Sequence, residues 1–437
     1  MQTRVRMRYE ATTMEEREFS VSEAPSVPEF AAPEERIMKP RRAAPADVVR
    51  PTRAEVSLDA LRCNLHAIRQ KAAGAKVWAV LKADAYGHGA PAVARTLERA
   101  KVDGFCVALV EEGVELREAG ITGPILVMGG YYGRAYEEML ARRLTPVVYD
   151  REHLETFARL VRARGGEPLA VHLKVDTGMA RLGVRPEEIP AFAEALAAHP
   201  ELRVEGLMTH LASADATTTE SLEHQQSRFE ATSKTLALLG IRPTYRHAAN
   251  SAALLREMAR YDAVRPGIAL FGVAPTIDGV SMAAGSGRDA DLVPSLRVRS
   301  EIIALRDVPA GEPVGYSGLF RTSRPSRIAT VAMGYADGLA RALTNRGAFL
   351  VGGKRAPVAG AVSMDMTMID VTDPPGTALG DEVVILGRQE GPFGRDEITL
   401  DELAGVNHDL GALAQHRGLA RHQVEQRTEA VPGLGER

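Results

Sequence analysis

The feature that most constrains this chain is a regular alternation between short β-rich runs and longer amphipathic stretches, from about residue 53 to residue 280. The amphipathic stretches have helical periodicity and lie at Ala90–Ala100, Arg151–Ala163, Ile189–Ala198 and Glu223–Leu239. Eight strands alternating with helices predict a parallel sheet closed into a TIM-like (β/α)8 barrel. A doubly wound open sheet is the alternative, but its GxGxxG fingerprint is absent after the first run. The eight β-rich runs are Val77–Leu81, Gly104–Leu109, Ile125–Met128, Pro146–Tyr149, Ala170–Val175, Val204–Thr209, Tyr245–Ala248 and Val264–Leu270.

The sequence changes character on both sides of this region. Up to about residue 50 there is no hydrophobic periodicity and prolines recur, which predicts a disordered extension. Beyond about residue 290, short strand-like segments are separated by Gly, Pro or Asp turns, which predicts a compact mainly-β domain. Residues 401–423 have weak helical periodicity. We therefore expect an extension at 1–50, a barrel at 51–288 and a β-domain at 289–437, with the first strand segment after residue 50 able to pack on the β-domain. The strand-like segments are Leu296–Ala304, Arg327–Met333, Ala348–Val351 and Glu382–Leu386.

Composition narrows the class of protein. The apolar share of 45%, the charged share of 25% and the net charge of −3 are typical of a globular protein and argue against a nucleic-acid or acidic-membrane partner. No apolar run approaches the roughly 18 residues that span a bilayer, and the N-terminus has no apolar signal core. We expect a cytoplasmic protein. Cys63 and Cys106 are expected to be small core residues, in a helix and a buried strand, and we predict neither a disulfide nor a metal site.

Lys82 stands at the end of the first predicted strand and is followed at once by the Gly-rich turn that ends at Gly89. The carboxyl ends of barrel strands carry the chemistry of this architecture. A half-desolvated lysine there loses its proton more easily than a surface lysine and can form a Schiff base. Taken alone, a lysine that merely caps a buried strand is the commoner case.

Other polar residues follow four more predicted strands. Each has an ordinary explanation: a helix N-cap for Asn250 or Ser251, a core histidine for His210, a surface turn for Arg265, an ion-pair partner for Lys174. Their joint placement at strand ends favours a site. The groups are Lys174–Gly183 with Arg181, Thr209–His210 with Ser213, Asn250–Ser251, and Arg265–Ile268.

The chemistry of these residues converges on one ligand. Ser251 at a helix start and the backbone at Gly267 and Ile268 offer hydrogen-bond donors to a phosphate dianion. Loops after the seventh and eighth strands form the usual phosphate site of a barrel. Lys82 lies beside the eighth strand once the barrel closes. An aldehyde-bearing phosphate cofactor that spans from Lys82 to these donors has the shape of pyridoxal phosphate.

The sequence resembles a known family, the pyridoxal-phosphate alanine racemases of fold type III, over approximately residues 53–425. The motifs occur in the family's order and are together highly specific. They are Val80–Gly89, His172–Met179 and Arg265–Gly267 in the barrel, and Val314–Ser317, Met333–Gly338 and Ser363–Asp365 in the β-domain.

The resemblance implies a role for each site residue. Lys82 would bind pyridoxal 5'-phosphate covalently and act as the base on the D face, and Tyr316 would be the opposing base. Arg265 would contact the pyridine nitrogen, with His210 behind it. Further implied cofactor ligands are Tyr86, Asn250, Ser251, Gly267 and Ile268; implied substrate-binding residues are Arg181 and Met364; implied supporting residues are Lys174, which can be carbamylated in this family, Tyr335 and Asp365.

The resemblance further implies racemisation of L- and D-alanine, which would supply D-alanine for cell-wall peptidoglycan, and a head-to-tail homodimer in which Tyr316 and Met364 come from the partner. One position departs from the family: the pair Asn407-His408 stands where Asn-Tyr is common, which alters the substrate entrance.

Two alternatives stay open. One is an amino-acid racemase of broader specificity, favoured by His408 and recognised by faster turnover of serine, lysine or arginine. The other is a non-catalytic pyridoxal-phosphate-binding protein, although the small single-domain barrels of that type lack a β-domain. Decarboxylases place a carboxylate near the pyridine nitrogen, and Arg265 argues against them.

Overall fold

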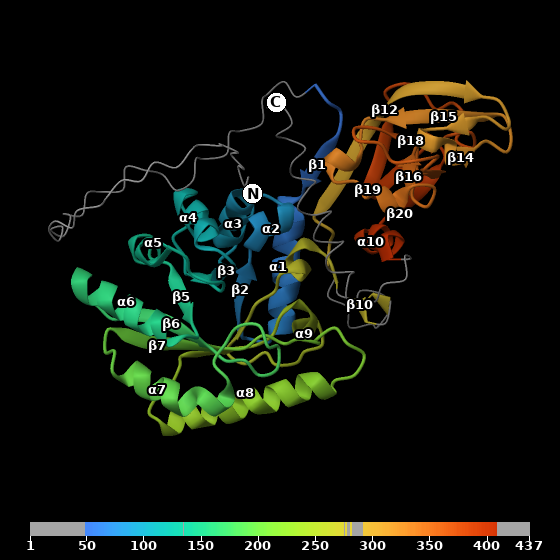
Figure 1. The fold of residues 1–437 in the computed structure, drawn as a ribbon. Helices are drawn as coiled ribbons and strands as arrows, with labels where there is room; N and C mark the ends of the chain where they lie inside the picture. Colours follow the sequence, from blue (N-terminus) through green and yellow to red (C-terminus); the bar gives the residue numbers. More distant parts are fainter. Residues whose placement is uncertain (1–48, 134, 275, 278–279, 282–291, 409–437) are drawn as a thin grey trace, which may run out of the picture. The chain divides into compact units, whose positions relative to one another are not determined.

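The computed structural model describes residues 49–133, 135–274, 276–277, 280–281 and 292–408. Within them the chain forms an eight-stranded parallel barrel followed by a mainly-β region, so the predicted fold class is confirmed (Figure 1). The predicted extension lies outside the described residues except for Val49 and Arg50.

The barrel closes in sequence order from β2 to β9. Closure is made by β9 beside β2, where Lys76 pairs with Ala263 and Val77 with Val264. Strand β2 is buried at every position after Lys76, as expected for a parallel strand covered on both faces. The strands are β2 Lys76–Val80, β3 Gly104–Val107, β4 Ile125–Val127, β5 Thr145–Val148, β6 Leu169–Lys174, β7 Leu202–Met208, β8 Tyr245–His247 and β9 Ala263–Val264.

Helices connect the barrel strands and surround them (Figure 1). Local capping explains where several begin: the Ser57 side chain accepts the Ala60 N–H at α1, and Asp150 accepts the Glu152 N–H at α6. The helices are α1 Leu58–Ala72, α2 Lys82–Gly87, α3 Ala90–Arg99, α4 Val110–Glu118, α5 Ala135–Ala141, α6 Arg151–Arg164, α7 Ile189–Ala197, α8 Glu220–Leu238 and α9 Ser251–Leu255.

The eighth predicted strand, Val264–Leu270, is shorter in the structure. Strand β9 ends at Val264, and residues Ile268–Phe271 form a short 3-10 helix, η2. Pro266 has no N–H for a strand ladder, and Gly267 has a ψ of −94°, far from extended backbone. The chain therefore turns here and leaves backbone N–H groups at the carboxyl end of the barrel.

The β-region is built on an eight-stranded sheet with its own apolar core. Strand β12 alternates buried and partly buried residues over its first half, the pattern of an antiparallel strand with one covered face. The strand order of the sheet is β17-β16-β19-β12-β15-β18, with β1 beside β12 and β20 beside β19. The elements of the β-region are β1 Arg53–Val56, β12 Leu296–Val308, β15 Ser326–Val331, β16 Ala348–Val351, β17 Lys354–Pro357, β18 Thr367–Asp370, β19 Glu382–Gly391, β20 Gly394–Ile398, the two-stranded sheet of β13 Pro313–Val314 and β14 Phe320–Arg321, and the helix α10 Leu400–His408. A separate two-stranded sheet of β10 Thr276–Ile277 and β11 Val280–Ser281 lies between the barrel and this region in the sequence.

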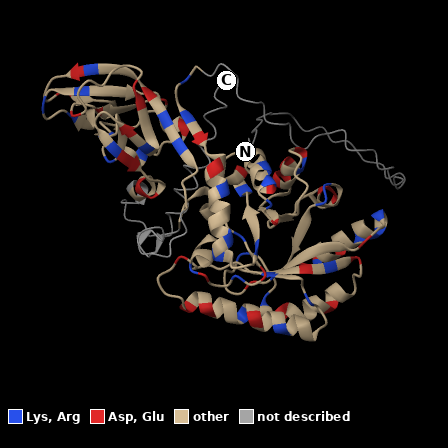
Figure 2. Cartoon of the chain, turned by 180° about the vertical axis from the view of Figure 1, so that it is seen from behind, with Lys and Arg blue, Asp and Glu red and all other residues tan. Residues whose placement is uncertain are grey.

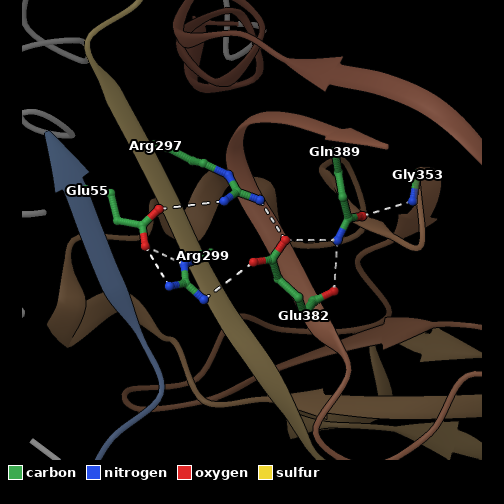
Figure 3. A network of polar contacts seen from close by, with 6 residues as sticks. All are labelled: Glu55, Arg297, Arg299, Gly353, Glu382 and Gln389. Carbon is green, nitrogen blue, oxygen red and sulfur yellow. Dashed lines mark hydrogen bonds and ion pairs between the residues drawn. The ribbon is translucent and has the colours of Figure 1, made fainter. Parts of the chain in front are cut away.

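Strand β1 precedes the barrel in sequence yet pairs with β12 in this sheet. Charged side chains reinforce the pairing: Glu55 contacts both Arg297 and Arg299, and the two arginines also contact Glu382 on β19 (Figure 3). The segments that precede and follow the barrel in the sequence are thereby joined in one sheet.

Lysine and arginine are interspersed with aspartate and glutamate on the outer helices and on the sheet (Figure 2). Among the described residues, no helix is both long and apolar enough to cross a membrane. Cys106 is buried on β3 as predicted. The prediction for Cys63 is wrong, because this residue lies on the exposed face of α1, whose buried face is formed by Leu61, Leu65 and Ile68.

Candidate active site

Lys82 lies two residues beyond Val80, where β2 ends, and is the first residue of α2. The next four residues, Ala83 to Tyr86, form a left-handed turn with φ between 50° and 56°. Non-glycine residues avoid this conformation, at about 1–2 kcal/mol each. Contacts to carboxylates hold the turn: Glu112 accepts the Ala83 N–H at 2.6 Å, and Asp84 accepts the Ala90 N–H at 2.8 Å.

The amine of Lys82 has a lowered pKa. Burial is the main cause, the nearby Arg181 cation adds to it, and Glu112 opposes both. Its Nζ lies 5.7 Å from the centre of the Tyr86 ring, which places the two side chains on the same side of the turn. A lysine in this setting has an increased share of neutral amine, the form that acts as nucleophile or base.

A small cradle of hydrogen-bonding groups lies next to Tyr86. The Ser251 hydroxyl accepts the backbone N–H of Gly267 at 2.9 Å and that of Ala269 at 3.3 Å. A Cβ atom at Gly267 would clash with the Tyr86 hydroxyl, so the glycine keeps the cradle open. Hydroxyls and backbone N–H groups gathered around a position without a side chain fit a phosphate group. Asn250 does not point its amide oxygen into the cradle but caps α9 by accepting the Ala253 N–H.

Arg265 follows β9 and is almost completely buried. It donates to the Thr209 carbonyl at 2.7 Å, to the Ala248 carbonyl at 3.2 Å and to His247 Nδ1 at 2.7 Å. Burial lowers its pKa to about 10, which still leaves it cationic at neutral pH. Within the described part of the chain, no carboxylate lies at ion-pair distance from it.

Four basic side chains of the predicted site act together on His210. Burial, then Arg265, Arg181, Lys174 and Lys82 in that order, lower the pKa of His210 well below its usual range. The ring of His210 is therefore neutral. Burial is also the main reason that the pKa of Lys174 falls to about 8, with Arg181 and Arg265 adding to the effect. The arrangement favours an anionic ligand.

The predicted β-domain residues come later in the sequence than this cluster and belong to the mainly-β region. Tyr316 is 72% exposed and Met364 47% exposed, although both are large apolar side chains. The Tyr335 N–H donates to the Ser363 carbonyl, and the Ala336 N–H donates to the Met364 carbonyl, both at 2.9 Å. These two hydrogen bonds hold the segment 363–365 against the turn that begins at Tyr335.

Three residues near the site were not predicted from the sequence. Glu112 supports the Lys82 turn, and His247 and His172 form a hydrogen-bonded pair next to Arg265. The imidazole that bonds Arg265 is His247, whereas a supporting role for His210 stays a prediction. His172 lies two positions before Lys174 on β6, a spacing that places both on one face of a strand and is the one available sequence signal. The side chain of His408 lies outside the described residues.

Comparisons with known proteins identify the family of this chain. Residues 56–275 match the family model "Alanine racemase, N-terminal domain", and residues 295–411 match "Alanine racemase, C-terminal domain". A curated alanine racemase of Sorangium cellulosum is 55% identical over 82% of this chain and 94% of its own length.

Solved structures give the same result. The alanine racemase of a D-cycloserine-producing Streptomyces lavendulae superposes with a TM-score of 0.77 at 31% identity, covering 86% of this chain and 95% of that one. The alanine racemase of Bacillus anthracis with bound L-Ala-P superposes with a TM-score of 0.76 at 31% identity, covering 87% and 94%. On these matches the chain belongs to the alanine racemase family of isomerases.

Proposed function

We propose that this chain interconverts L- and D-alanine with pyridoxal 5'-phosphate as cofactor. The observation that carries the proposal is the joint placement of Lys82, the Gly267 cradle and a group of cations at the carboxyl end of one barrel. When bound, pyridoxal phosphate supplies an electron-withdrawing ring that acidifies the α-proton of an amino acid.

The barrel residues would divide the binding of this cofactor among them. Ser251, Tyr86 and the N–H groups at Gly267 and Ile268 would hold its phosphate. Arg265 would face the ring nitrogen, and Lys82 would take the aldehyde end. Asn250 would contribute indirectly, since its side chain fixes the start of α9, where Ser251 stands.

Racemisation needs a proton removed from one face of the α-carbon and another delivered to the opposite face. Lys82 suits one face, because burial and Arg181 favour its neutral amine. Tyr316 would serve the other face. A lysine and a tyrosine on opposite sides exchange roles when the reaction reverses, which makes one site competent in both directions.

Tyr316 and Met364 would come from a second copy of the chain. Their exposure of 72% and 47% supports this, since large apolar groups left open on one chain are suited to cover a site in another. In a head-to-tail homodimer, each chain would supply these two residues to the site of the other chain, so that both sites would be complete.

The substrate carboxylate would be bound by Arg181, which Lys174 would orient, with Arg265 adding positive potential around it. A pKa of about 8 gives Lys174 a sizeable share of neutral amine, the form in which carbamylation takes place. We also propose that the enzyme acts in the cytoplasm and supplies D-alanine for peptidoglycan, and that residues 51–288 and 289–437 are its barrel and β-domain.

A panel of amino acids tests the proposal. Loss of chirality would be measured for alanine, serine, lysine and arginine with the wild type, with Tyr316→Phe and with Tyr132→Phe as a control. Tyr132 is 77% exposed but lies in the barrel region. We expect alanine to be the best substrate, Tyr316→Phe to lose at least about a hundredfold in turnover, and Tyr132→Phe to lose none.

Two results would change the assignment. Normal alanine racemisation by Tyr316→Phe would contradict the two-base mechanism. Faster turnover of serine, lysine or arginine would replace the alanine-specific enzyme by a racemase of broader range.

A further inference from the structure

A buried row of polar side chains leads away from Arg265 through the interior of the barrel. Arg265 Nη1 lies 2.7 Å from His247 Nδ1, and His247 Nε2 lies 2.8 Å from His172 Nδ1. His172 Nε2 is buried without a hydrogen-bond partner, and the carboxylate that it faces is that of Glu205, one oxygen of which lies 3.9 Å away, at ion-pair but not hydrogen-bond distance. Both imidazoles are at most 1% exposed, whereas the Glu205 side chain is 28% exposed.

The guanidinium at one end of the row sets the direction of its two hydrogen bonds. A guanidinium only donates, so His247 Nδ1 must accept from Arg265. A neutral imidazole has one donor and one acceptor, so His247 Nε2 carries the proton and donates to His172 Nδ1. His172 Nε2 then carries a proton that faces Glu205, and an ionised carboxylate only accepts. Arg265 therefore fixes the tautomer of both rings, and the position of Glu205 agrees with it, because the protonated Nε2 of His172 faces the carboxylate.

Neither ring is expected to take a second proton at neutral pH. Burial, followed by Arg265 and His172, holds the pKa of His247 well below its usual range. Burial also lowers the pKa of His172, although Glu205 opposes it. With two neutral rings in between, Glu205 is the carboxylate that this row connects to the buried charge of Arg265.

The barrel has a specific opening for this row. His172 on β6 and His247 on β8 are separated by β7, and the residue of β7 that pairs with His172 is Gly206. A Cβ atom at Gly206 would clash with the His172 ring. The missing side chain is what lets the two imidazoles meet across the intervening strand.

We propose that Glu205 is a positioning residue for Arg265, acting through the neutral imidazoles of His172 and His247. The row holds one guanidinium nitrogen in place and leaves Arg265 a donor-only group aimed at the site. The tautomers follow from the contacts alone, whereas the effect on alanine turnover rests on the proposed function.

The chain contains a built-in marker for these rings. Trp78 is its single tryptophan, and its ring centre lies 5.2 Å from that of His172 and 6.0 Å from that of His247. Nuclear Overhauser contacts to the Trp78 indole therefore identify both rings among the 11 histidines. The experiment is ¹⁵N-histidine NMR of the full-length protein with pyridoxal phosphate added. We expect both rings to carry a proton on Nε2 only; a proton on Nδ1 of either ring, or two protons on one, would overturn the proposal.

Two substitutions then test the action on Arg265. Glu205→Gln keeps the shape and removes the charge, and it should shift the ring N–H signals of both histidines and lower kcat for alanine by about tenfold with little change in KM. Arg203→Gln is the matched control, because Arg203 contacts the same carboxylate at 3.4 Å but is not in the row. Unchanged His247 signals in Glu205→Gln, or an equal loss of kcat in Arg203→Gln, would contradict the proposal. Absence of alanine racemisation in the wild type would overturn the proposed function. The tautomers of His172 and His247 would then still test whether Arg265 and Glu205 are connected through these rings.

Discussion

Arg50 and Asp337 form a bidentate ion pair, with guanidinium nitrogens 2.8 and 2.7 Å from the two carboxylate oxygens. Arg50 also donates to the Asp365 carbonyl at 2.9 Å, next to the proposed substrate-lining residue Met364. Arg50 thus ties the segment before β1 to two turns of the β-domain.

Replacing Arg50 by Ala should lower the free energy of unfolding by about 1–3 kcal/mol at pH 7. The Asp337 carboxyl is buried, burial raises its pKa, and Arg50 counteracts that shift. Because the ion pair is lost when the carboxyl takes up a proton, the effect of Arg50→Ala should shrink as the pH falls toward about 4.5. Urea unfolding at both pH values measures this, with Arg53→Ala as an exposed control; an effect that is equal at both would contradict the assignment.

The left-handed turn after Lys82 predicts an unusual response to glycine. Ala83 has a φ of 50°, so Ala83→Gly should raise the free energy of unfolding by about 1 kcal/mol, because glycine adopts this conformation without strain. Ala67→Gly in the right-handed helix α1 should instead lower it by about 1 kcal/mol. Chemical denaturation of both variants is the measurement. Destabilisation by both would mean that contacts of the Ala83 methyl group outweigh the backbone strain.

Lys174 predicts a pH dependence of stability. Its pKa is about 8 in the folded chain against an ordinary value of 10.5, so between these values the unfolded chain holds a proton that the folded chain has released. The free energy of unfolding should therefore rise with pH in this window, by at most about 1.4 kcal/mol per pH unit for one proton. Lys174→Gln should lose this rise, and Lys354→Gln, on the exposed side of β17, should keep it. Identical slopes in wild type and Lys174→Gln would refute the shifted amine.

Much of the fold could be predicted because its signals are local. Apolar patterns with periods of two and 3.6 residues predict the barrel strands to within a few residues. In the β-domain, the predicted segment Ala348–Val351 coincides with β16. The eighth strand was predicted too long, because the apolar residues beyond Pro266 have the composition of a strand while the backbone turns at Gly267. The apolar residues of this segment therefore predict its burial correctly, whereas Pro266 and Gly267 determine where the strand ends.

The candidate site was predictable only in part, because some of its features have a local sequence signal and others depend on contacts between distant residues. Lys82 and Ser251 stand at strand or helix ends, where a barrel must present its polar groups. His172 and His247 lie 75 positions apart on strands that do not pair, and their contact depends on the absence of a side chain at Gly206. No local pattern encodes such a contact. The left-handed turn was equally hidden, since its residues carry none of the glycines that announce this conformation.

The charged network that joins β1 to the sheet should behave as a coupled unit (Figure 3). Glu55 lies 2.6 Å from Arg299, and these side chains are 40% and 27% exposed, so solvent screens the pair only partly. A double-mutant cycle with Glu55→Gln and Arg299→Gln should give a coupling energy of about 0.5–1 kcal/mol that decreases in 1 M salt, because both arginines also contact Glu382 and are held in place. The pair Arg324–Asp373, 53% and 62% exposed, should give a smaller coupling energy, because solvent screens it more strongly. Equal coupling in the two pairs would show that the network adds nothing to its separate contacts, and β1 would then be held by its backbone ladder with β12 alone.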